Sequence, residues 1–102
     1  MLSYNRLVNE LKTPKQMERH LKGISNHYRI AILLLIDKNK NITLEGIVGS
    51  LKANQKTISE HTRRLMSAGL IEKSYSGNYV EHRLSPYGKK FVSFLKSLQK
   101  SF

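Results

Sequence analysis

The stretch LKANQKTISEHTRRLMSAGLI, residues 51–71, decides the fold. It predicts a helix that begins after Asn54, because this side chain can accept a hydrogen bond from a free amide of the first turn. Ile58 and Leu65 lie seven residues apart and therefore share one face of that helix. Gly69 marks its end, since glycine readily adopts the left-handed conformation that closes helices. We expect the second half of a helix-turn-helix here.

The opposite face of this helix is polar and mostly cationic, which suits a helix laid in the major groove of DNA. Its members are Lys56, Ser59, Glu60, Arg63 and Ser67. For one basic face alone, a solvated surface helix is the better interpretation. The rest of the chain reverses that preference.

Four more helices are expected before this stretch. They span residues 3–12, 14–22, 27–37 and 44–51. The second begins with a capping box, in which Thr13 is the cap, Pro14 takes the first helical position and Gln16 reaches back. Gly23 is expected to end it. The third helix is apolar nearly all round, which predicts a central core helix.

A β-hairpin and a last helix are expected after it. The two strands span residues 70–75 and 79–84. Gly77-Asn78 is a two-residue turn signal, and the register that it sets places Glu72 opposite Arg83. Ser85 then caps a helix that runs toward the C-terminus. The 102 residues form one domain, mainly α with a small β-hairpin, and a helix-turn-helix followed by a hairpin is a winged helix-turn-helix.

The charge balance favours a polyanionic partner. The chain carries 18 Lys and Arg against 7 Asp and Glu, for a net charge of +11. Nucleic acid is the first expectation and an anionic membrane the second. Residues 30–36 are the longest apolar run, far short of the ~20 residues that a spanning helix needs. The polar N-terminus does not resemble a signal peptide, and the absence of cysteine fits a cytoplasmic chain.

Residues 25–84 resemble the ArsR-type family of small winged-helix repressors. Three segments carry the resemblance: RIAILLLI at 29–36, QKTISEH at 55–61 and LMSAGLI at 65–71. They are similar to the core helix, the recognition helix and the junction into the wing of that family. MarR-type regulators share the last of these. The resemblance implies a homodimeric, DNA-binding transcriptional repressor.

The chain departs from the family at its metal sites. ArsR-type metal sensors often carry a Cys-x-Cys pair before the turn, where this chain has residues 45–48, or Asp and His ligands on the last helix. Residues 85–102 contain no Asp, Glu, His or Cys. The histidines also lack paired ligand spacing; they are His20, His27, His61 and His82. We expect no metal and no cofactor. A further departure is Thr62, where the family usually has Leu, so we expect a slightly looser helix there.

We expect specific binding to double-stranded DNA. The residues expected at the interface are Gln55, Lys56, Thr57, Ser59, Glu60, Arg63, Arg64, Lys52, Lys73 and Asn78. Gln55 can pair with adenine and Arg63 can read guanine or grip phosphate, whereas Arg64, Lys52 and Lys73 suit phosphate. The alternatives are an RNA-binding or architectural winged helix and a protein-interaction adaptor. An enzyme ranks last, because Ser59 and His61 point to different sides of the helix and no phosphate loop or nucleophile elbow is present.

Both ends of the chain carry apolar stripes that one small core does not need in full. They are Leu2, Leu7, Val8 and Leu11 at one end, and Phe91, Phe94, Leu95, Leu98 and Phe102 at the other. The surplus predicts an isologous dimer interface built from helices within residues 1–22 and 85–102. Leu7, Leu11, Phe91, Phe94, Leu95 and Leu98 are its expected contacts. The alternative is a monomer whose terminal helices wrap the domain.

Overall fold

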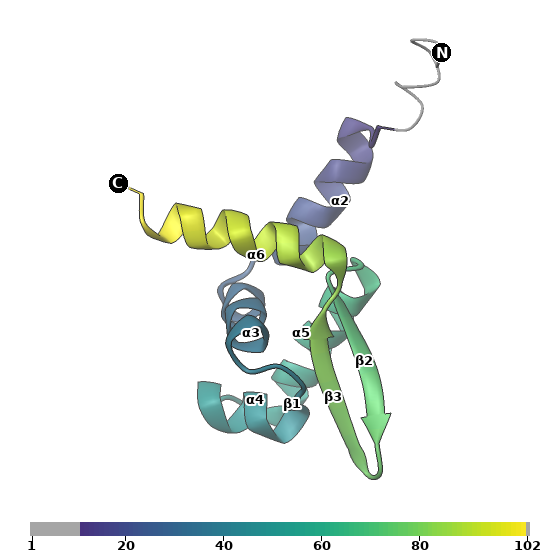
Figure 1. Ribbon diagram of the computed structural model, residues 1–102, viewed down its shortest axis with the longest axis vertical. Coiled ribbons are helices and arrows are strands. Elements are labelled where there is room, and N and C mark those ends of the chain that lie inside the picture. The colour runs from purple at the N-terminus through teal and green to yellow at the C-terminus, as the bar shows by residue number, and fades with distance from the viewer. Residues whose placement is uncertain (1–10, 102) are drawn as a thin grey trace.

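Figure 1 shows the computed structural model, which describes residues 11–101. The elements follow the order α2 (Pro14–Ile24), α3 (His27–Lys38), β1 (Ile42–Thr43), α4 (Leu44–Leu51), α5 (Gln55–Ser67), β2 (Ile71–Ser76), β3 (Tyr79–Leu84) and α6 (Pro86–Gln99). This is the winged helix-turn-helix that the sequence predicts. The helix expected at residues 3–12 lies outside the described residues, apart from its last two positions, which are not helical.

Side-chain caps begin the helices where the sequence places them. The capping residues are Thr13, Asn26, Thr43, Asn54 and Ser85. In the capping box of α2, the Gln16 amide donates to Thr13 Oγ1 over 3.2 Å, and the Thr13 amide donates to Gln16 Oε1 over 2.8 Å. At α5, Asn54 Oδ1 accepts from two backbone amides, at 2.8 and 3.3 Å. Each cap satisfies amides that have no partner within the helix.

The core forms around α3, which lies between α6 on one side and the α4–α5 pair on the other (Figure 1). Its fully buried side chains include Ile32, Leu33, Ile36, Ile47, Ile58, Leu65 and Leu70. They come from α3, α4, α5 and the junction into the wing, so the helix-turn-helix and the wing share one core with α3. Burying a side chain of this size contributes about 1.5–3 kcal/mol to stability.

The sheet has three strands, in the order β1-β3-β2, and the first of them is not evident from the sequence. The hairpin register is confirmed: Glu72 pairs with Arg83, and their side chains form an ion pair of 3.3 Å. The short strand β1 pairs with β3, placing Ile42 opposite His82. His82 is buried, and its Nδ1–H donates to the Ile42 carbonyl over 3.0 Å. This bond ties the base of the wing to the start of α4.

Gly23 does not end α2, as the sequence suggested, because the helix continues to Ile24. Gly23 instead allows two helices to approach each other closely. A Cβ at Gly23 would lie 2.6 Å from the Cβ of Ala68, which follows α5. The missing side chain thus lets α2 pack directly on the end of α5.

Thr62 occupies a core position on α5 without interrupting the helix, which is α-helical from Gln55 to Ser67. The side chain is buried, and its hydroxyl donates to the Ser59 carbonyl over 2.9 Å. A buried hydroxyl costs stability only when it lacks a partner, so this bond makes Thr62 tolerable where an apolar residue is expected.

Gly88 offers a test of how tightly α6 docks on the core. A Cβ there would overlap the Leu70 carbonyl oxygen, which already accepts the Ser85 amide over 3.0 Å. We expect Gly88→Ala to lower the free energy of unfolding by about 1–3 kcal/mol, measured by urea denaturation. Gly49 is the matched control, because nothing lies within 4 Å of a Cβ there. Gly49→Ala should stabilise the helix by about 0.5–1 kcal/mol, and equal effects at both glycines would contradict this packing.

Candidate nucleic-acid interface

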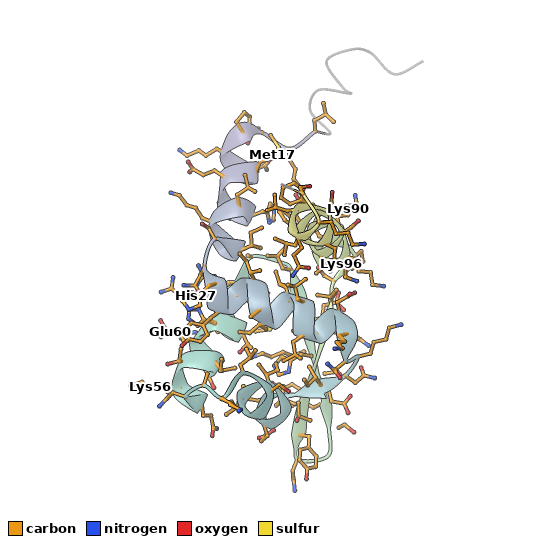
Figure 2. All side chains as sticks on the ribbon, turned by 90° about the vertical axis from the view of Figure 1, so that its left-hand side faces the viewer. Met17, His27, Lys56, Glu60, Lys90 and Lys96 are labelled. Atoms are coloured by element: carbon orange, nitrogen blue, oxygen red, sulfur yellow. The ribbon has the colours of Figure 1, made fainter. Side chains whose placement is uncertain are left out.

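α5 buries one face and exposes the other. Ile58 and Leu65 are fully buried against the core. Lys56, Glu60 and Arg63 are exposed. Figure 2 shows Lys56 and Glu60 along one outer edge of the molecule, with their side chains directed away from the core. The facing of this helix is therefore the one that the sequence predicts, and it leaves a polar, mostly cationic ridge in solvent.

The turn before α5 fixes how this ridge is presented. Three residues, Lys52 to Asn54, connect α4 to α5. Lys52 has a φ of 51° and a ψ of 44°, the left-handed conformation of a residue that ends a helix, here α4. Its side chain is exposed in the turn between the two helices. This cation lies next to the N-terminus of α5, where the helix dipole also favours an anion.

The other residues predicted for this interface are spread over α5 and the wing. Gln55 is exposed at the first position of α5, whereas Thr57 and Ser59 are half-buried. Arg64 is exposed and pairs with Glu60 over 3.4 Å. In the wing, Lys73 is half-buried in β2 and Asn78 is exposed in the turn. α5 and the wing tip do not need to contact each other in order to bind the same extended partner.

Two exposed tyrosines flank the wing tip, and neither was predicted as a site residue. Tyr75 is 79% exposed and Tyr79 is 59% exposed. Each lies in a strand of the hairpin, where aromatic residues are common, so the sequence alone does not separate them from core aromatics. They add apolar and hydroxyl surface to a tip that lacks Lys and Arg.

Beneath α5, Arg29 joins three helices. Its side chain is only 9% exposed. Nε donates to the Gly23 carbonyl over 2.6 Å, and Nη2 donates to the Lys22 carbonyl over 3.3 Å, which secures the end of α2. Nη1 donates to Nδ1 of His61 on α5 over 3.1 Å. The ring of His61 also stacks on that of Tyr28, with centroids 5.5 Å apart.

The bond from Arg29 requires a neutral His61, because a protonated imidazole has no acceptor nitrogen. Burial lowers the pKa of His61, and the charge of Arg29 lowers it further. The geometry and the electrostatics therefore agree on a neutral ring whose proton sits on Nε2. A catalytic pairing of Ser59 with His61 has no support, since His61 Nδ1 is engaged by Arg29.

Next to this junction lies an open groove between α2 and α5, with a volume of about 560 Å³. Its charged lining residues are Arg19, Lys22, Arg29, Arg63 and Arg64. Arg63 belongs both to this groove and to the exposed ridge of α5. Arg19 and Lys22 were not predicted as site residues, because their distance in sequence from α5 hides their proximity.

An apolar surface covers α2 and α6 on another side of the molecule. Phe94 and Leu98 are 56% and 57% exposed, and Met17 and Leu21 of α2 are exposed beside them. Of the predicted dimer contacts, Leu95 is buried in the core of the protomer at 5% exposure. Phe91 is half-buried and packs against the core, Leu11 is exposed, and Leu7 lies outside the described residues.

Comparison with known proteins supports a resemblance to one family. The model of the arsR family of bacterial regulatory proteins matches residues 26–73, from the cap of α3 into β2. This part of the chain, slightly less than half of it, is similar to the ArsR family. The resemblance drawn from the core helix, the recognition helix and the wing junction is thereby confirmed. A search of curated protein sequences gives no match.

Solved structures of similar fold agree with the family. HlyU from Vibrio cholerae N16961 superposes with a TM-score of 0.75 at 24% identity, covering 82% of this chain and 91% of that one. The transcriptional repressor PagR of Bacillus anthracis gives 0.72 at 20% identity, with coverages of 79% and 93%. The homodimeric winged helix-turn-helix domain of Mb0332 from Mycobacterium bovis gives 0.76 at 21% identity, with coverages of 96% and 87%. The chain therefore has the same fold as these winged-helix proteins.

Residues 11–101 contain no group of three or more His, Cys, Asp or Glu side chains placed to hold a metal ion. Over the same range, no helix is both long enough and apolar enough to cross a membrane.

Two histidines, His82 in the core and the half-buried His61, predict that acid destabilises the fold. The pKa values of His61 and His82 are both lowered, mainly by burial. The unfolded chain, whose histidines titrate near 6.5, then binds more protons than the folded chain. We expect the free energy of unfolding to be maximal above about pH 6.5 and to fall as the pH drops toward 5, in urea titrations at each pH.

Two variants test whether these two histidines cause the pH dependence of stability. His61→Asn and His82→Asn should each reduce the loss of stability between pH 7 and pH 5, even if they lower stability at pH 7. If the free energy of unfolding of the wild type stays constant or increases as the pH falls from 7 to 5, the two rings are not held in the neutral state by the fold.

Proposed function

We propose that this chain is a homodimeric transcriptional repressor that binds double-stranded DNA in a sequence-specific manner and acts as one winged-helix domain. The observation that carries the proposal is the exposed cationic ridge of α5 on an ArsR-family fold. A helix of this size fits the major groove, where base edges present distinct donor and acceptor patterns. The cytoplasm, which holds the bacterial chromosome, is the compartment that this function requires.

The residues of the ridge divide by chemistry into base-reading and phosphate-binding groups. Lys56, Ser59, Glu60 and Arg63 are proposed to face the major groove, with Gln55 and Thr57 near its entry, where Gln55 can pair with adenine. Arg63 suits guanine, because its guanidinium donates two parallel hydrogen bonds. Lys52, Arg64 and Lys73 are proposed to grip phosphates, and Asn78 to touch the backbone from the wing. Phosphate contacts fix the register without reading the sequence.

The homodimer is proposed to form through the apolar surface of α2 and α6. Exposed apolar patches rimmed by polar residues are typical of interaction sites, and Phe94 and Leu98 are each more than half exposed. The neighbour Mb0332 is described as homodimeric. A two-fold dimer would present two α5 helices to half-sites about one DNA turn, roughly 34 Å, apart.

Removal of single cations should separate DNA binding from folding. Arg63→Ala should weaken specific binding by about 1–3 kcal/mol if it pairs with a base, and Lys56→Ala should act in the same direction, both measured by fluorescence anisotropy on a labelled duplex. Lys38→Ala is the matched control, because Lys38 is exposed at the far end of α3. Circular dichroism should show all three variants folded.

The salt dependence distinguishes DNA from the alternative partners. Affinity for duplex DNA should fall steeply with salt, and single-stranded RNA should bind more weakly. Equal affinity for the two nucleic acids would favour the RNA-binding or architectural alternative. A protein partner with no nucleic-acid binding at any salt concentration would favour the adaptor.

Sedimentation equilibrium tests the dimer. The wild-type chain should sediment at twice the protomer mass of 11.8 kDa at micromolar concentration. Leu98→Glu should yield a folded monomer, because it places a charge in the proposed interface. Tyr79→Glu alters a similarly exposed apolar residue on the wing and should remain dimeric. A single wild-type species near 11.8 kDa would rule the dimer out.

A further inference from the structure

The groove between α2 and α5 concentrates positive charge from three helices. Its lining includes Arg19, Lys22, Arg29, Arg63, Arg64 and Ser67, and none of the residues that line it is acidic. These cations come from positions up to 45 residues apart in the sequence, as the numbers of Arg19 and Arg64 show. The fold therefore assembles this cluster, and a solvated charge run along a single helix does not explain it.

Gathering these cations carries an electrostatic cost. Burial lowers the pKa of Arg29, and the charge of Arg64 lowers it further. The only acidic partners of the lining residues in residues 11–101 sit at the rim: Glu18 pairs with Lys22 over 3.7 Å, and Glu60 pairs with Arg64 over 3.4 Å. Both pairs are exposed, and exposed pairs contribute little. An anion in the groove would relieve the remaining repulsion.

Arg29 gives the groove a fixed floor. Its side chain is more than nine-tenths buried. Hydrogen bonds to Gly23, Lys22 and His61 use one N–H each of Nε, Nη2 and Nη1. A guanidinium has five N–H groups, so one remains on each terminal nitrogen of a side chain that lines the groove. A fork held in place by three bonds loses little entropy when it binds a ligand.

We propose that the α2–α5 groove binds a phosphate group, with Arg29 as its fixed donor and Arg19, Lys22, Arg63 and Arg64 supplying charge from the walls. Guanidinium groups match the spacing of phosphate oxygens and donate paired, charge-assisted hydrogen bonds to them. The Ser67 hydroxyl adds a neutral donor at the rim.

Two sources can supply that chemistry: the backbone of DNA, or a soluble phosphorylated molecule. Arg63 is shared with the proposed DNA-binding ridge, so a backbone phosphate that flanks the bound major groove lies within the same surface. The phosphate site itself does not rest on the proposed function, because it can be measured without any DNA.

The direct test is a titration of the full chain with inorganic pyrophosphate at constant ionic strength, followed by ¹⁵N NMR of backbone amides and arginine Nε groups. We expect saturable shifts centred on Arg29 and on neighbouring positions of α2 and α5. Arg19→Gln and Arg64→Gln should each weaken pyrophosphate about tenfold, as expected for loss of a hydrogen bond to a charged group.

The matched control is Lys15→Gln, which removes the same charge from an exposed position of α2 outside the groove. Its pyrophosphate affinity should match that of the wild type. Linear, non-saturating shifts, or an equal loss of affinity in Lys15→Gln, would overturn the proposal and show that net charge alone attracts the anion.

A second arm identifies the source once pyrophosphate binding is established. If a backbone phosphate occupies the groove, Arg19→Gln should reduce the slope of log affinity for duplex DNA against log salt by about one, and pyrophosphate should compete with DNA. If the source is a soluble molecule, the slope should not change. Absence of DNA binding would defeat the proposed function yet leave the pyrophosphate result standing, so the two failures are distinguishable.

Discussion

The packing of α5 against α3 is the constraint on which the rest of the structure depends. Ile58 and Leu65 are fully buried against the central helix, and this burial sets the rotation of α5 about its own axis. The opposite, cationic face must then lie in solvent. Because side chains on a helix repeat every 3.6 residues, packing the apolar face against α3 also fixes the position of the charged ridge.

Arg29 extends this constraint to α2. It is a buried charge near the start of a helix whose central residues, 30–36, are apolar, and such a group is costly unless it is hydrogen-bonded. Its bonds to carbonyls at the end of α2 and to His61 of α5 hold three helices at one point. The same bonds leave donors on the lining of the cationic groove, so a residue required for packing also serves the proposed phosphate site.

Much of the fold could be predicted from the sequence, because its signals are local. Caps at Thr13, Asn26 and Asn54 and the turn at Gly77 each act within a few residues, and the structure confirms them. The strand β1 escaped prediction because two residues carry no alternation, and it exists only by pairing with β3. Gly23 was misassigned because its reason is the approach of Ala68, far along the chain.

The candidate site likewise has a part that could be predicted from the sequence and a part that could not. The ridge of α5 could be predicted, since its residues follow one helical period. The groove could not, because Arg19 and Arg63 meet only through tertiary packing. Leu95 shows that helical periodicity does not distinguish a core residue from an interface residue. It continues the apolar stripe of Phe91 and Leu98, yet it is buried in the core of the protomer. The period of a helix gives the side on which a residue lies, whereas the neighbouring elements decide what covers it.

The central claim is that the buried face of α5 orients a ridge that reads DNA sequence. Selection of genomic fragments by the purified full chain, sequenced after binding at a low and a high salt concentration, tests it most directly. The account predicts a near-palindromic motif whose half-sites lie about 10 base pairs apart and whose enrichment persists at the higher salt, where non-specific binding weakens. Fragments without a shared motif at either concentration would contradict it.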